Sequence, residues 1–164
     1  MEKDKRLATA IDLRNNNELQ ASMKQLERLA KEYSTDAKVL YECASGYDQL
    51  GEERAAAPFY ERSLEGQLNE TDRRGAYTGL GSTYRTLGEY EKAKAVLEKG
   101  MDEFPDDEAL RTFHAICLYN LGDSEKAVEQ LIGSLLNTST DPHIHMYKGA
   151  LEFYRHRLNQ VWEG

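Results

Sequence analysis

Apolar and small residues recur along this chain at intervals of three and four, with polar residues between them. Residues 79–105, GLGSTYRTLGEYEKAKAVLEKGMDEFP, show the pattern most clearly, with Gly81, Tyr84, Ala93 and Leu97 among the recurring positions. Steps of three and four place residues on one face of a helix, whereas strands need alternation by two. The pattern therefore predicts helices along the chain and no strands.

The same arrangement returns about 34 residues later and, with a short insertion, about 37 residues earlier. Each copy contains a Leu-Gly pair: Leu50-Gly51, Leu87-Gly88 and Leu121-Gly122. Glycine adopts the positive φ of a tight helix-helix turn at little cost. Periods of this length indicate stacked supersecondary units. We therefore expect antiparallel helix pairs joined by short turns.

Residues of the third unit occupy the signature positions of one repeat family: Tyr77, Leu80, Gly81, Tyr84, Ala93, Leu97, Gly100 and Pro105. On these residues the chain resembles a tetratricopeptide repeat protein, whose unit has about 34 residues. The other units depart from the pattern in places. Arg111 stands where a large apolar residue is usual, Ser139 replaces the terminal proline, and Asn17 replaces the first turn glycine.

The resemblance implies one all-α domain over residues 1–164, an α-solenoid of antiparallel helix pairs with about nine helices. We divide it into a degenerate repeat at about 3–36, a repeat at about 37–73 with an insertion, repeats at 74–107 and 108–141, and a capping helix at about 142–162. Asp141 and Pro142 suit the start of that last helix as N-cap and first helical residue. Pro58, inside a predicted helix, is expected to kink or delay it.

Composition narrows the function. The chain is 40% apolar and 30% charged, which suits a soluble folded domain. Its start lacks the apolar run of a secretory signal, and no stretch of about 18 apolar residues is present, so we expect a cytoplasmic protein without membrane association. A net charge of -8 without a basic stripe disfavours nucleic acid as a partner.

No catalytic, cofactor or metal site is expected. Cys43 and Cys117 fall at apolar positions of different units, which predicts buried thiols and no disulfide. Histidines crowd the last predicted helix, but their spacing does not place two ligands on one face. His114 stands where the family prefers leucine, so it is interpreted as a partly buried core residue, with a pH-dependent role in partner binding as the alternative.

In the family that the chain resembles, the first helix of each pair lines a concave groove that holds peptides or partner helices. The resemblance thus implies an adaptor or scaffold that binds a protein or peptide and performs no catalysis; a merely solvated face is the alternative. Carried over by position, the groove residues are Lys38, Tyr41, Ser45, Asp48, Gln49, Thr78, Ser82, Arg85, Thr112, Ile116, Tyr119 and Asn120.

Two other functions stay open at this point. Leu7 and Ile11 would face the groove as an apolar patch in one helix register, which suggests a homo-oligomeric structural protein, such as a homodimer formed through a terminal repeat. In a register shifted by one position both residues belong to the core. An enzyme or ligand sensor would need a pocket between Pro58 and the insertion that follows it.

Overall fold

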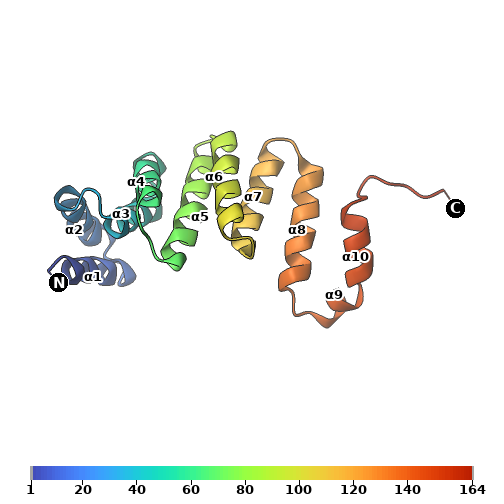
Figure 1. Cartoon of the computed structure of the whole chain (residues 1–164), viewed down its shortest axis with the longest axis horizontal. Helices are drawn as coiled ribbons and strands as arrows, with labels where there is room; N and C mark the ends of the chain where they lie inside the picture. The colour runs from blue at the N-terminus through green and yellow to red at the C-terminus, as the bar shows by residue number, and fades with distance from the viewer. Residues whose placement is uncertain (1, 164) are drawn as a thin grey trace.

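The computed structural model describes residues 2–163, which contain ten helices and no strand. The helices stand in a row of antiparallel pairs that runs from the N-terminal end of the molecule to the C-terminal end (Figure 1). Their bounds are α1 Glu2–Asn15, α2 Leu19–Glu32, α3 Ala37–Gln49, α4 Glu53–Glu65, α5 Glu70–Thr86, α6 Tyr90–Glu103, α7 Glu108–Asn120, α8 Ser124–Thr138, α9 Pro142–Met146 and α10 Lys148–Arg155. The predicted all-α solenoid is confirmed.

The first helices of the pairs pack more closely along the row than the second helices do. Helix α3 contacts α1 and α5, and α5 also contacts α7. Contacts among α2, α4, α6 and α8 are sparse or absent within residues 2–163. A row that is tighter on one side curves toward that side. The first helices therefore line the inner, concave side, and the second helices form the outer side with furrows between them.

Four turns inside the helix pairs share one backbone conformation. Gly51, Gly88 and Gly122 have φ of 72°, 77° and 87°, and Asn17 has φ of 65°. In each turn the next residue donates its backbone N–H to a carbonyl five residues back, as Glu89 does to Tyr84 at 2.9 Å. Asparagine enters this left-handed region more readily than most non-glycine residues. The glycine turns are confirmed, and Asn17 replaces the missing glycine.

The small residues of the repeat allow helices to approach closely. Ala44, Ala56 and Ala93 are fully buried, and the side chain of Leu97 packs onto Gly81. Leu7 is only 6% exposed and belongs to the core between α1, α2 and α3, with Ile11 at its margin. The hypothesis of an exposed apolar patch at these two residues is therefore wrong, because α1 has the register that turns them inward.

The insertion lengthens one helix. Helix α5 has 17 residues, whereas α3 and α7 have 13 each, and residues 66–69 connect it to α4. Helix α4 begins at Glu53 and continues through the exposed Pro58, so the proline does not delay its start. The extra turn of α5 and its connection therefore absorb the additional residues.

The closing segment forms two short helices in place of the single capping helix expected. Helix α9 starts at the predicted cap, where the Asp141 side chain accepts from the His143 N–H at 2.7 Å. It ends at Met146, because the C-cap residue Tyr147 has a ψ of 11°, outside the helical range, and α10 follows from Lys148. Beyond Arg155 the described chain is not helical, and Asn159 donates to Glu125 of α8 at 2.9 Å. The closing segment is therefore helical only as far as Arg155, with a break at Tyr147.

Candidate functional site

The residues expected to form the concave groove all lie on α3, α5 and α7, the helices of the inner side. Their side chains differ in how far their polar groups are already engaged within the protein. Three of those on α3 contact neighbouring helices, whereas one residue on α5 and one on α7 retain buried atoms without hydrogen-bond partners. The two ends of the groove therefore have different chemistry.

At the α3 end, Lys38 and Tyr41 join neighbouring helices. The Lys38 Nζ lies 2.7 Å from Glu42 Oε1 and 2.7 Å from Asp72 Oδ2 of α5. Burial lowers the pKa of Lys38, but the two carboxylates outweigh it and the net pKa is raised. The Tyr41 ring lies on α5 at Gly75, where a Cβ would come 2.5 Å from its hydroxyl oxygen. These two side chains hold the neighbouring units together.

Asp48, one residue before the end of α3, is also engaged. Its Oδ2 accepts from the Tyr60 hydroxyl of α4 at 3.2 Å. Burial raises the pKa of Asp48, and this hydrogen bond offsets only part of the rise. The side chain is thus a partly buried carboxyl group with a raised pKa, and one of its two oxygens is engaged by Tyr60.

The α5–α7 end has hydrogen-bonding atoms without partners. Within residues 2–163, Nε of Arg85 and Oδ1 of Asn120 are buried and make no hydrogen bond. Arg85 lies near Cys117 of α7, since its charge offsets part of the rise in the Cys117 pKa that burial causes. Tyr119 beside them is 66% exposed. Leaving such atoms unpaired costs about 1 to 3 kcal/mol each.

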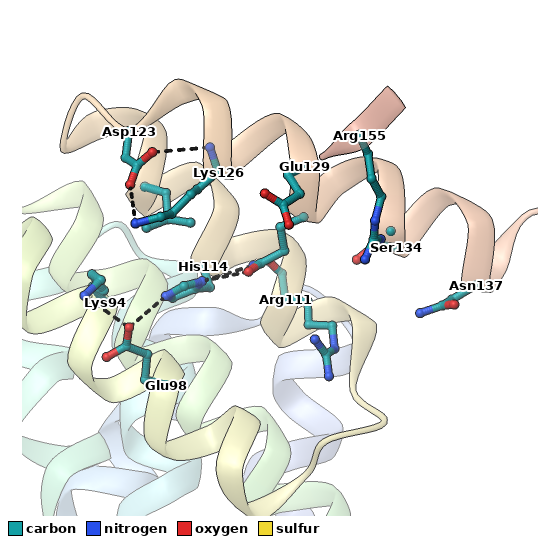
Figure 2. Close-up of a pocket in the computed structure, with 13 residues that line it drawn as sticks. Lys94, Glu98, Arg111, His114, Asp123, Lys126, Glu129, Ser134, Asn137 and Arg155 are labelled. Atoms are coloured by element: carbon teal, nitrogen blue, oxygen red, sulfur yellow. Dashed lines mark hydrogen bonds and ion pairs between the residues drawn. The ribbon is translucent and has the colours of Figure 1, made fainter. Parts of the chain in front are cut away.

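The outer side carries a cavity that the sequence did not predict. It has a volume of about 640 Å³ and lies between α6 and α8, with α7 as its floor and Arg155 of α10 at its edge (Figure 2). Arg111 and His114 are part of this floor. Both residues depart from the repeat signature, and those departures were the only signal of the cavity in the sequence.

His114 is the buried centre of a hydrogen-bond network in this cavity. It is 6% exposed, as its interpretation as a core residue requires. Its Nε2 lies 3.2 Å from Glu98 Oε1, and its Nδ1 lies 3.0 Å from the Gln130 amide nitrogen. Because that amide donates, the geometry suits an imidazole with its proton on Nε2. Burial raises the pKa of Glu98, but its contacts with Lys94 and His114 lower that pKa by more than burial raises it. The net pKa of Glu98 is therefore below its ordinary value.

Other candidate chemistry from the sequence has a structural explanation. Cys43 and Cys117 are free and buried, as predicted, and burial raises the pKa of Cys43 to about 12. No three His, Cys, Asp or Glu side chains between residues 2 and 163 gather as ligands for a metal ion. No helix in that range combines the length and the apolar character needed to cross a membrane.

Comparisons with known proteins agree with this architecture. Residues 37–158 match the sequence model of a family described as tetratrico peptide repeat. A crystal structure of MamA superimposes with a TM-score of 0.72 at 17% identity, over 99% of this chain and 79% of that chain. The crystal structure of YrrB, described as a TPR protein with an unusual peptide-binding site, gives 0.70 at 19% identity, over 94% and 78%. No curated protein matches the chain. At these identities the structures establish the fold.

Proposed function

The chain belongs to the tetratricopeptide repeat family, and from this premise we propose that it is a scaffold that binds a peptide or partner helix in its concave groove without catalysis of its own. The observation that carries the proposal is the pair of unpaired buried atoms, Arg85 Nε and Asn120 Oδ1, on neighbouring first helices. A peptide backbone offers the acceptor and the donor that these two atoms lack.

The α5–α7 half is the centre of the proposed groove. Lys38 and Tyr41 are occupied between α3 and α5. Arg85, Tyr119 and Asn120 have free hydrogen-bonding atoms or exposed surface. Tyrosine gives a partner a large apolar face and a hydroxyl group at low entropic cost. The remaining proposed contacts are Ser45, Asp48, Gln49, Thr78, Ser82, Thr112 and Ile116.

The comparisons support a peptide ligand through the shared fold alone. YrrB, whose description names a peptide-binding site, has the same arrangement of helices over 94% of this chain. The identity of 19% does not carry individual contacts across. The choice of groove residues therefore rests on this chain alone.

The test is affinity capture from the native cell, followed by measured binding of the purified partner. The groove variant combines Arg85→Gln and Tyr119→Ser, and Lys99→Gln on the outer side of α6 is the matched control. We expect the wild type and the control to bind the partner and the groove variant to lose it, with equal melting temperatures. A partner that binds all three proteins equally would contradict the proposal.

A second candidate, self-association, is favoured by the C-terminal end of the row. Large apolar side chains are exposed there: Met146, Tyr147, Phe153, Tyr154, Val161 and Trp162. The Trp162 ring lies 5.8 Å from that of Tyr154 and 6.0 Å from that of Phe153, so three aromatic residues form one exposed cluster. Exposed apolar clusters often mark interfaces. A homodimer of this kind should become a monomer in light scattering when Tyr154 and Trp162 are replaced by serine, whereas the groove variant should leave it intact.

A further inference from the structure

Two furrows on the outer side are built from equivalent positions of successive units but differ in chemistry. One lies between α4 and α6, and the other is the cavity between α6 and α8. Three positions differ in side chain 34 residues later: Tyr77, Leu80 and Val96 correspond to Arg111, His114 and Gln130. At the last two positions a hydrogen-bonding side chain replaces an apolar one. Burying polar groups costs free energy unless they are paired, so packing alone does not explain the exchange.

At a fourth position, a glycine replaces a lysine and makes room for an arginine of the closing segment. Gly133 of α8 stands where Lys99 stands one unit earlier. A Cβ at position 133 would overlap Nη1 of Arg155. The glycine therefore lets Arg155 reach from α10 onto α8 beside Ser134, as Figure 2 shows. In this way the last helix closes one side of the cavity with a guanidinium group.

Two arginine side chains that line the cavity retain donors without partners. Arg155 uses Nε, 3.3 Å from Glu152, and within residues 2–163 neither of its Nη atoms has a partner. Arg111 donates from Nη2 to the Pro105 carbonyl at 2.8 Å, and its Nε lies 3.9 Å from Glu108, which also accepts from Ser134 and Asn137; its Nη1 is unpaired in the same range. Two guanidinium groups at one cavity thus each retain free N–H groups.

The carboxylates of the cavity already have cationic or hydrogen-bonding partners. Glu98 lies 3.1 Å from Lys94 and 3.2 Å from His114. Asp123 lies 3.1 Å from Lys126. Glu129 lies 2.8 Å from His156. Apart from His114, four cationic side chains and three carboxylates line the cavity, which leaves one net positive charge.

From these observations we propose that the cavity between α6 and α8 binds the carboxylate of an acidic side chain in a partner peptide, held by Arg111 and Arg155. The planar guanidinium group binds a carboxylate through two parallel hydrogen bonds. One net positive charge matches a carboxylate better than a phosphate, which carries nearly two negative charges. The volume of 640 Å³ leaves room for neighbouring peptide atoms.

This site is separate from the concave groove and does not depend on it. The overall charge of -8 opposes an acidic ligand only weakly at physiological salt, where charges beyond about 8 Å are screened. A partner that wraps around the row would contact both sides. The outer site would then select for an acidic residue at one position of the partner.

The test uses NMR on the full chain, following the side-chain Nε–Hε signals of Arg111 and Arg155. The probes are acetyl-Ala-Glu-Ala-amide, the glutamine version of the same peptide, and inorganic phosphate. We expect saturable shifts of both signals with the glutamate peptide and none with the glutamine peptide. Arg155→Gln should weaken binding on the order of tenfold, and Arg111→Gln, which leaves α10 in place, should do the same.

Two controls locate the effect. Lys99→Gln, which changes a cation of the other furrow, should leave the affinity for the glutamate peptide unchanged. The groove variant, Arg85→Gln with Tyr119→Ser, should also leave it unchanged, so that failure of the groove proposal would not affect this result. The proposal is overturned if millimolar glutamate peptide shifts neither signal, if the glutamine peptide shifts them equally, if phosphate binds more tightly, or if Lys99→Gln weakens binding as much as Arg155→Gln.

Discussion

Gly81 of α5 lies so close to Leu97 of α6 that a Cβ at position 81 would come within 2.5 Å of the Leu97 Cγ. Both residues are buried, and the contact joins the two helices of the third unit. The same two positions are part of the repeat signature in the sequence. The contact shows why a small residue is needed there, since no flexible side-chain end is available to move away.

The change Gly81→Ala should therefore lower the free energy of unfolding by about 1 to 3 kcal/mol, because overpacking outweighs the gain in helix propensity. Gly149→Ala in α10 is the control, since no atom lies within 4 Å of its added Cβ. That change should be neutral or stabilising by up to about 1 kcal/mol. Urea unfolding of the two variants measures both values. Equal effects would contradict the packing argument.

The turn at Gly88 permits a second prediction. Its φ of 77° is strained for residues other than glycine, although a Cβ at this position would meet no neighbouring atom within 4 Å. Gly88→Val should cost about 1 to 2 kcal/mol, and Gly88→Asn should cost less. Asn17, which adopts φ of 65° at the corresponding turn, is the natural precedent. Thermal unfolding of both variants compares them. A valine variant as stable as the asparagine variant would show that the turn relaxes.

The buried pair of His114 and Gln130 should behave as a coupled unit. Gln130→Val removes the donor to Nδ1 of His114 and should destabilise the fold by about 1 to 3 kcal/mol. His114→Leu combined with Gln130→Val restores the apolar pair of the preceding unit, Leu80 and Val96, and should lose less than the sum of the single changes. A double-mutant cycle measures this coupling. Additive effects would mean that the hydrogen bond contributes nothing.

The stability that the N-cap residue Asp36 gives to the start of α3 should decrease in acid. Asp36 caps α3 by accepting from the Val39 N–H and also binds Lys3 at 2.6 Å. Burial raises its pKa, but these hydrogen bonds lower it more, so the net pKa is depressed. A depressed pKa contributes stability that is present above the unfolded value of about 3.9 and is lost as the pH falls through the folded value.

We therefore expect wild type and Asp36→Asn to differ in unfolding free energy by a constant amount between about pH 5 and 7, and the difference to shrink below about pH 4. Asparagine also caps helices, so the variant isolates the charge. Denaturant unfolding across this range provides the measurement. A difference that stays constant down to about pH 3 would exclude a role for the Asp36 charge.

Much of the architecture was predictable because its causes are local. Spacing by three and four places Leu80, Tyr84 and Leu97 on buried helix faces whatever the neighbouring units do. The closing helix was predicted less well. Its apolar spacing continues past Tyr147, but the helix stops there and the chain returns to α8. A break that depends on contacts with another helix leaves no periodic signal.

The sequence by itself determined the helix pairs, the turns at Gly51, Gly88 and Gly122, and the buried thiols, since backbone conformation and helix faces follow from short segments. Only the tertiary structure decided which polar residues remain free. Lys38 is engaged because α5 brings Asp72 to it, and the outer cavity exists because α7, α8 and α10 bring Arg111, Gln130 and Arg155 together. Distances between units depend on how whole helices pack, and short segments do not encode them.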